Sequence, residues 1–284
     1  MRGRSISVEH STVYRYNSAV HLEPHTFRLR PRMTTTQLLL SFDLRIVPAP
    51  AGATESLDQD GNLALHAWFN TPAFELNVTS RYRVELLRDN PFDFTLPTGS
   101  QRLPLWYTPT LAESLSAYRN DLNVSDPVKQ YAKSLAADAQ WDVMSFLTAL
   151  NRHIFYNFQH VTRPEGPARP SDETLNLRQG SCRDLAVLFC DVCRVMGVAA
   201  RFVSGYECAS AGQHDSSMHA WAEVYLPAAG WRGYDPSRGL AVADGHVAVA
   251  AAFDADLAAP ISGLFQGACE SQMETRLYMQ VDSV

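Results

Sequence analysis

A cysteine, a histidine and an aspartate in the second half of the chain could together carry out nucleophilic chemistry. Cys182 lies in Gln179-Gly-Ser-Cys-Arg-Asp184, directly before an apolar segment that ends at Met196-Gly197. Ser181 and Asp184 have the spacing of a capping box, which predicts a helix with Cys182 in its first turn. Unpaired N–H groups and the helix dipole favour an anion there, and with a neighbouring imidazole they lower a thiol pKa from about 8.5 to about 3.5–7.5. This segment alone leaves two interpretations open, an activated nucleophile and a buried cysteine.

The base and the acid come from a predicted hairpin. His219-Ala-Trp-Ala-Glu-Val-Tyr-Leu226 alternates as a strand does, after a polar loop around Gly212–Ser217, and Trp231-Arg-Gly-Tyr-Asp-Pro236 follows a short break. A hairpin brings the start of the first strand near the end of the second, so His219 and Asp235 become neighbours. A thiol nucleophile needs a base, and that base needs a group that fixes its tautomer. Cys182, His219 and Asp235 therefore predict a catalytic triad.

The register of this hairpin decides whether the triad can form. In one register, which pairs Leu226 with Trp231, the acid falls roughly 10 Å from His219 at ~3.4 Å per residue. In another, which pairs Tyr225 with Gly230, the acid lies beside His219 but on the opposite face, and a bulge is needed to correct the face. We expect the second kind of pairing, with local irregularity.

The first half of the chain alternates with period two, which predicts strands over Ile6–Tyr16, Gln37–Val47, Leu63–Phe69 and Phe74–Leu87. Asp60-Gly61-Asn62 suits a hairpin turn. Several strands without a long helical pattern predict an antiparallel sheet or sandwich. Prolines between Pro91 and Pro109 suggest a linker.

Helical patterns follow, over 128–139 and 143–156, and then comes a proline-rich loop over 159–172. We therefore predict an α+β protein with a β-rich antiparallel N-terminal domain over residues 1–105. The second domain, over 106–284, is expected to pack helices on an antiparallel sheet.

Composition narrows the class of protein. The 284 residues carry a net charge of −6, and the sequence pI near 5.8 speaks against nucleic-acid binding, because phosphate neutralisation needs a basic patch. No apolar stretch approaches the ~18 residues of a membrane span, and no secretory signal is visible, so we expect a cytoplasmic location. The five cysteines, an odd number, do not resemble a disulfide framework. Cys190 and Cys193 form a C-x-x-C within the predicted helix, where they are expected to be core residues and not a redox pair.

Together, these residues resemble the bacterial transglutaminase-like superfamily, whose core is a papain-like cysteine fold. The resemblance lies in Gly180-Ser-Cys-Arg-Asp-Leu-Ala186, in Arg194–Tyr206, in His219–Pro227 and in Gly230-Trp-Arg-Gly-Tyr-Asp-Pro236. It extends to the whole chain, because the β-rich half is similar to the domain that precedes this core in bacteria. The tail is also similar, with His246-Val-Ala-Val-Ala-Ala followed by a strand from Glu270 to Val281. Ser181 and Met218 depart from the residues that are commoner in the family, which bears on substrate fit.

The resemblance implies Cys182 as nucleophile, His219 as base and Asp235 as orienting acid. The Cys182 N–H would be one oxyanion donor, and the second stays open among Tyr156, Gln159 and Gln179. We expect a cysteine-dependent acyl-transfer enzyme that acts on an amide or peptide through a thioester, with hydrolysis favoured over cross-linking. The alternatives are a protein-glutamine transamidase and a non-catalytic scaffold. No cofactor or metal is expected, and the sequence leaves the oligomeric state open.

Several further residues have a structural interpretation and a functional one. We interpret Asp184 as a helix-start carboxylate, Arg183 as a solvated charge, and His153 and His160 as structural histidines. Trp221 and Tyr225 share the His219 face by strand parity and either line a cleft or pack under the sheet. Residues of further note are His21 and His25, interpreted as surface histidines, and Asp58, Asp60 and Asn62, which lack the glutamate that would close a calcium loop.

Overall fold

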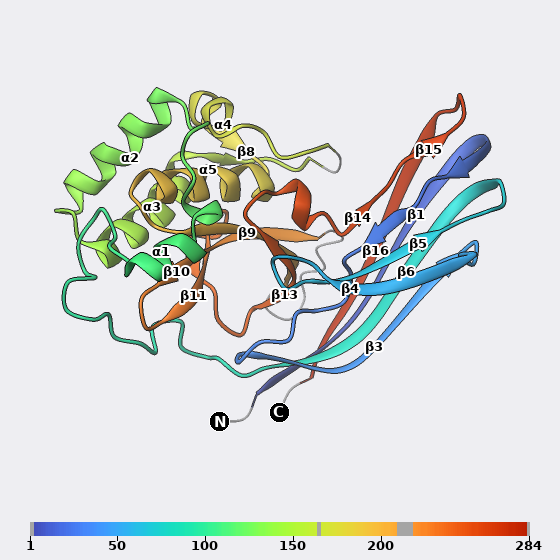
Figure 1. The fold of residues 1–284 in the computed structure, drawn as a ribbon, viewed down its shortest axis with the longest axis horizontal. Coiled ribbons are helices and arrows are strands. Elements are labelled where there is room, and N and C mark those ends of the chain that lie inside the picture. The colour runs from blue at the N-terminus through green and yellow to red at the C-terminus, as the bar shows by residue number, and fades with distance from the viewer. Residues whose placement is uncertain (1–2, 164–165, 209–217, 283–284) are drawn as a thin grey trace.

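The computed structural model describes residues 3–163, 166–208 and 218–282, so the polar loop around Gly212–Ser217 lies outside the described residues. Figure 1 shows the helices gathered on one side of the molecule and the long strands on the other. A sheet formed by strands within residues 200–252 lies between them. The predicted α+β class, with a β-rich first part and helices packed on an antiparallel sheet, is confirmed.

Two antiparallel sheets form the β-rich part. In the larger sheet, β1 (Arg4–Leu22) lies between β6 (Ala73–Leu86) and β16 (Ser271–Asp282), with β3 (Gln37–Val47) beyond β6 and β15 (Phe265–Gln266) at the far end of β1. The smaller sheet has the order β14 (Ile261–Ser262), β2 (His25–Phe27), β5 (Leu63–Trp68) and β4 (Gly52–Leu57). Alternate residues of both sheets meet in a shared core, which is the sandwich that period-two alternation predicts.

Both ends of the chain contribute to these sheets. The last strands, β14, β15 and β16, pair with β1 and β2 from the first part of the chain. The boundary near residue 105 stays a prediction, but the structure adds that residues 261–282 pair with the sheets of the first part.

The second part packs helices on a five-stranded antiparallel sheet. Its order is β12 (Leu240–Ala241), β11 (Gly230–Asp235), β10 (His219–Leu226), β9 (Ala200–Glu207) and β13 (His246–Ala252). The α-helices are α1 (Pro109–Ser114), α2 (Asp126–Asp138), α3 (Val143–Asn157), α4 (Ser171–Leu177) and α5 (Cys182–Val195); short 3₁₀ turns cover Ala117–Arg119 (η1) and Asp256–Ala258 (η2). A two-strand parallel pair, β7 (Gln159–His160) with β8 (Gln179–Gly180), leads into α5.

Helix α5 is the central element of this part. Its apolar face buries Leu185, Leu188, Phe189 and Val192 to 1% exposure or less, against β9, β10 and the other helices. At about 1.5–3 kcal/mol for each fully buried large side chain, this face fixes the position of the helix on the sheet. The first turn of α5, where Cys182 lies, is therefore held rigidly above β10.

The opposite face of the five-stranded sheet packs against the β-rich part. Ile6 and Val84 from the larger sheet share one buried cluster with Tyr206 of β9 and Val247 of β13. Among the strands of the described residues, β13 is an edge strand that pairs with β9 alone. The β-rich part thus forms one wall behind the strands that carry the candidate site.

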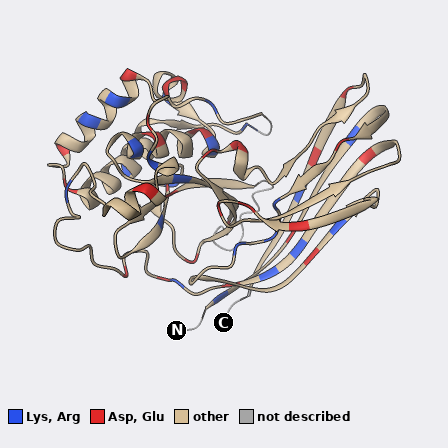
Figure 2. Ribbon diagram, in the orientation of Figure 1, with Lys and Arg blue, Asp and Glu red and all other residues tan. Residues whose placement is uncertain are grey.

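Acidic and basic residues are interspersed over both parts of the protein (Figure 2). Among the described residues, no helix combines the length and the apolar character that crossing a membrane requires.

Candidate active site

Cys182 is the first residue of α5, as the capping-box spacing predicts. Asp184 Oδ2 accepts hydrogen bonds from the Ser181 N–H at 2.8 Å and from Ser181 Oγ at 3.0 Å. Cys182 is partly exposed, and its neighbours Ala186 and Ala220 are small buried residues. Cys182 is therefore a partly exposed residue at a helix N-terminus, with a small apolar cluster beside it.

Asp184 does more than the predicted interaction with the helix dipole. Its side chain is fully buried, and both carboxylate oxygens accept from Nη1 of Arg163, at 2.6 and 2.8 Å. The Arg169 N–H donates to Oδ1 at 2.8 Å. Arg183, interpreted from the sequence as a solvated charge, instead donates to the Gly166 carbonyl at 2.8 Å. The Asp184 carboxylate and the Arg183 guanidinium thus bind the described parts of the loop over 159–172 to the first turn of α5.

The hairpin that carries the base and the acid adopts neither expected register. Leu226 pairs with Gly230 and Ala222 with Tyr234, so the next position of β11, Asp235, falls opposite Trp221. Opposed residues share a face, and His219 lies two residues before Trp221 on that face. The acid therefore reaches the imidazole diagonally across the strands, without the bulge that we expected.

His219 and Asp235 are in direct contact. His219 Nε2 lies 2.6 Å from Asp235 Oδ2, and the Asp235 side chain is fully buried. Asp235 Oδ1 accepts from the Ser237 N–H at 3.0 Å and from Ser237 Oγ at 2.7 Å. Although burial opposes ionisation, the hydrogen bonds from His219 and His246 outweigh it and hold the pKa of the Asp235 carboxyl well below its usual range. Because Nε2 is committed to the acid, Nδ1 of His219 is the atom that faces the thiol.

The thiol and the imidazole form an ion pair. Burial disfavours the thiolate, but hydrogen bonds from His160 and His219, together with the charge of His219, lower the pKa of Cys182 to about 6. Burial likewise disfavours the imidazolium, yet its hydrogen bonds to Asp235 and Cys182 raise the pKa of His219 to about 10. At neutral pH the thiolate and the imidazolium are therefore the main forms. The structure brings together all three predicted residues, and their catalytic roles are considered below.

His160 is a functional candidate that sequence reasoning missed. We interpreted it as structural, but its side chain lies near enough to Cys182 to lower the pKa of the thiol. The parallel pairing of β7 with β8 sets His160 beside Gly180, and the Val161 N–H donates to the Gly180 carbonyl at 3.0 Å. A two-residue parallel bridge has no periodicity, so no sequence signal linked these positions.

The three candidates for a second oxyanion donor are placed as follows. Tyr156 is 69% exposed and lies against Phe155 and the Arg152 guanidinium. Gln159 and Gln179 pair with each other through the backbone of β7 and β8. The donor from this stretch that contacts the thiol is His160.

The remaining sequence candidates are structural. Cys190 and Cys193 lie buried in the second half of α5, and burial raises the pKa of Cys190 to about 12 and that of Cys193 well above its usual value. Such thiols are poor redox groups, as the helix position predicts. Trp221 is 1% exposed and stacks under His219, with ring centroids 6.4 Å apart, so it supports the base from within the sheet. His153 packs edge-on against Tyr131.

Asp58, Asp60 and Asn62 form a closed turn of hydrogen bonds. Asp58 Oδ1 accepts from the N–H groups of Asp60 and Asn62, and Asp60 Oδ1 accepts from the Tyr118 hydroxyl. These oxygens are engaged with donors of the chain itself.

A second imidazole reaches the same acid. His246 Nε2 lies 2.9 Å from Asp235 Oδ2, so His219, Asp235 and His246 form a group with the ligand types of a metal site. The two nitrogen–oxygen distances are those of direct hydrogen bonds, and these explain the arrangement without an ion.

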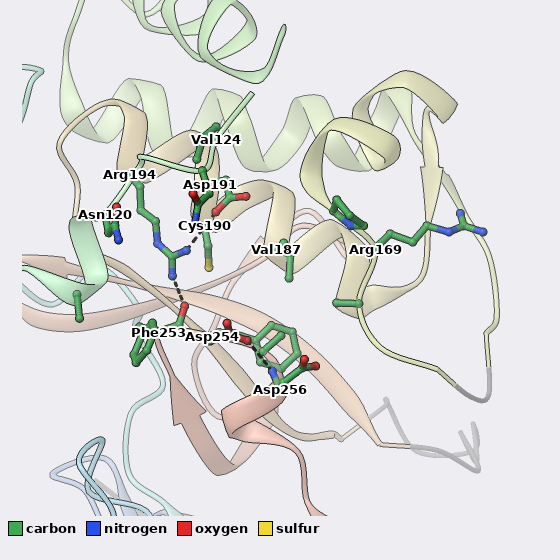
Figure 3. Close-up of a pocket in the computed structure, with 16 residues that line it drawn as sticks. Asn120, Val124, Arg169, Val187, Cys190, Asp191, Arg194, Phe253, Asp254 and Asp256 are labelled. Carbon is green, nitrogen blue, oxygen red and sulfur yellow. Dashed lines mark hydrogen bonds and ion pairs between the residues drawn. The ribbon is translucent and has the colours of Figure 1, made fainter. Parts of the chain in front are cut away.

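A cavity of about 330 Å³ lies along the neighbouring face of α5 (Figure 3). Val187 and Ala255 line it and also belong to the cluster that packs against Cys182. Figure 3 shows Arg194 reaching from α5 to the Phe253 carbonyl, just beyond β13, and the same guanidinium donates to the Ala200 carbonyl at 3.1 Å. Arg194 thereby ties the end of β13 to α5.

Comparison with known proteins agrees with this fold. Residues 6–85 match the model of the bacterial transglutaminase-like N-terminal region, and residues 129–236 match the model of the transglutaminase-like superfamily. Uncharacterised proteins of Mycobacterium tuberculosis and Mycobacterium leprae are 27% and 24% identical; the alignments cover 90% and 92% of this chain and 86% and 92% of theirs.

One solved structure is similar in fold over the whole chain. A "Putative Cysteine Protease" from Cytophaga hutchinsonii has a TM-score of 0.73 at 20% identity, with 100% of this chain and 92% of that chain covered. This likeness, the two family models and the position of Cys182 on α5 agree with one another. Membership of this family supports a cysteine-dependent enzyme in general terms. The chain belongs to the transglutaminase-like superfamily, with a bacterial transglutaminase-like N-terminal region ahead of a papain-like core.

Proposed function

We propose that the protein cleaves an amide or peptide bond through a thioester on Cys182 and passes the acyl group to water. One observation carries this proposal: a partly exposed thiol at a helix N-terminus contacts an imidazole that lies 2.6 Å from a buried carboxylate. With a pKa of about 6, the Cys182 thiolate is favoured over the thiol at pH 7.

The proposed reaction has two halves. The Cys182 sulfur attacks the carbonyl carbon and forms a C–S bond, while the oxyanion accepts from the Cys182 N–H. As the C–N bond breaks, His219 gives its proton to the departing amine. His219 then takes a proton from water, the hydroxyl attacks the thioester, and the C–S bond breaks to release a carboxylic acid. Asp235 keeps the imidazole oriented throughout.

Water as acceptor is supported by the exposure of the site. His160, which contacts the thiol, is an exposed residue, and Cys182 is itself partly exposed. The partial exposure of Cys182 supports water as the acceptor. An amine acceptor shares the first half-reaction, so a protein-glutamine transamidase is the alternative within the same chemistry.

The proposal is tested by incubating the protein with a pool of N-acetylated peptides, including glutamine peptides, with and without a fluorescent primary amine. Hydrolysis gives fragments whose summed mass exceeds the parent by one water, and mass spectrometry detects them. Products that carry the amine at glutamine would instead support transamidation.

The controls are C182A and C182S, which remove the nucleophile and keep the fold. Turnover in the native protein that is lost in both variants supports the proposal. If the native protein and C182A bind the same peptides equally and neither turns them over, the protein is a binding scaffold and the proposal is wrong.

A further inference from the structure

Asp235 serves two histidines through one oxygen. Oδ2 lies 2.6 Å from His219 Nε2 and 2.9 Å from His246 Nε2, while Oδ1 is occupied by Ser237. His246 comes from β13, is 5% exposed and packs edge-on against Trp221 with ring centroids 5.1 Å apart. The second imidazole is thus built into the same buried cluster as the base.

His246 acts as a hydrogen-bond donor to the acid. Its Nε2 faces a carboxylate, so Nε2 carries the proton, and its buried Nδ1 has no hydrogen-bond partner among the described residues. The hydrogen bond to Asp235 therefore runs through Nε2, the one ring nitrogen of His246 that has a partner among the described residues.

The charged groups around the cluster are few. His219 faces Asp235 from β11, Cys182 from α5 and His246 from β13, and His160 of β7 also acts on the Cys182 thiol. Glu207 of β9 is opposite His246 in the ladder, but its carboxylate pairs with Arg238 at 2.6 Å. The proton affinity of His219 is accordingly governed by Asp235 and the Cys182 thiol, and by the second hydrogen bond that His246 makes to Asp235.

We propose that His246 is a positioning residue that fixes the Asp235 carboxylate and limits how strongly this carboxylate holds the proton of His219. Two donors on one oxygen share its electron density, so each hydrogen bond is weaker than it would be alone. In the reaction proposed above, on which this inference rests, His219 must release its proton to the departing amine. A carboxylate bound to His219 alone would retain that proton more strongly.

The structure suggests a sharp pair of variants. H246L removes the donor, and H246Q places an amide N–H within reach of the same oxygen. Because Nδ1 of His246 has no hydrogen-bond partner among the described residues, the glutamine gives up the ring contact with Trp221 but no other hydrogen bond. The matched control is H10Q. It replaces another buried histidine, His10, whose ring forms its hydrogen bond with the Tyr206 hydroxyl and not with Asp235.

The primary measurement is the pKa of His219 by NMR titration of ¹³C-labelled imidazoles, with H219A to assign the signal. We expect H246L to raise this pKa by about half a unit to one unit, and H246Q and H10Q to leave it near the native value. An unchanged or lowered pKa in H246L, or a raised pKa in H246Q, would overturn the proposal. If H246L does not fold, H246N, whose shorter amide falls short of Oδ2, takes its place with the same expectation.

Kinetics give a second readout. In H246L, we expect kcat to fall with little change in KM, and the alkaline limb of kcat/KM to move to higher pH, since this limb reports loss of the His219 proton. If H246L lost activity while the alkaline limb of its kcat/KM profile stayed at the native pH, His246 would have a structural role only, and the proposal would be wrong. Because the NMR titration needs no substrate, it tests His246 even if the native protein proves to have no turnover, so the two proposals can fail separately.

Discussion

The side-chain amide of Gln37 pairs with the backbone of Ala248 on the free edge of β13. Gln37 Nε2 donates to the Ala248 carbonyl at 2.8 Å, and the Ala248 N–H donates to Gln37 Oε1 at 2.8 Å. Asn62 makes the same paired contact with Ala251, at 2.8 and 2.9 Å. Two amides of the β-rich part therefore complete the hydrogen bonding of the edge strand that carries His246.

The first prediction concerns this contact. In Q37A the Ala248 carbonyl keeps the Arg32 N–H at 3.0 Å, but the Ala248 N–H is left without its acceptor. A buried unpaired donor costs about 1–3 kcal/mol, so we expect the free energy of unfolding in urea to fall by that amount. Q272A, at an exposed glutamine of β16, is the control and should leave it unchanged. Equal stability of Q37A and Q272A would contradict a role of Gln37 in holding β13.

The second prediction is the pH dependence of Cys182 alkylation. Since the thiolate is the reactive form and the pKa is about 6, the rate with iodoacetamide should be full at pH 8 and fall as pH drops through 6. In H219A the midpoint should move up toward the ordinary thiol value of about 8.5. Mass spectrometry of the peptides gives the rate at each site, with the partly exposed Cys269 as internal reference. A native midpoint near that ordinary value would refute the ion pair.

The third prediction concerns His160. Loss of its hydrogen bond to the thiol should raise the Cys182 pKa, so the alkylation midpoint of H160A moves to higher pH, by less than in H219A. H153A is the matched control, because His153 of α3 packs on Tyr131 of α2. If the pH profiles of Cys182 alkylation were the same in H160A and H153A, His160 would have no influence on the thiol and the prediction would be wrong.

The fourth prediction concerns the Asp184 carboxylate. D184N leaves the Arg163 guanidinium, which is 23% exposed, without its buried partner, and breaking such a pair costs about 3–5 kcal/mol. Burial opposes ionisation of Asp184, but hydrogen bonds from Arg163, Arg169 and Ser181 outweigh it and lower its pKa. The contribution of a carboxyl with a lowered pKa is complete above the unfolded value of about 3.9 and is lost as pH falls through the folded one.

The difference in unfolding free energy between the native protein and D184N should therefore be constant from pH 8 to 5 and shrink below about pH 4. D126N, at an exposed helix-start aspartate, serves as control. A difference that grows toward low pH would contradict the ion pair as its source.

Local patterns predicted the elements better than their pairing. The strand over Gln37–Val47 has the predicted bounds, and α3 begins at the predicted Val143, because alternation and helical periodicity report burial directly. The proximity of Cys182, His219 and Asp235 was predictable from residue types in order along the chain, and their catalytic roles stay a prediction. The cytoplasmic location and the domain boundary stay predictions.

Contacts between distant segments escaped prediction. His160 reaches the thiol through a two-residue parallel bridge, and His246 reaches Asp235 from an edge strand that pairs with β9. Neither position has a spacing relative to Cys182 that any local rule describes. The observed hairpin register lies between the two registers that we considered, one residue from each. The conformation of the turn, with positive φ at Ala228 and Gly230, decides the register, and the sequence pattern of the strands does not report it.

That turn determines whether the acid and the base meet at all. Side chains alternate between the two faces of a sheet, so inserting or deleting one residue between Leu226 and Gly230 would keep the strands paired but turn Asp235 away from His219. The same slip would carry Tyr234, which stacks on Phe189 in the core, to the other face. The length of one surface loop therefore sets both the packing of β11 and the meeting of the two proposed catalytic groups.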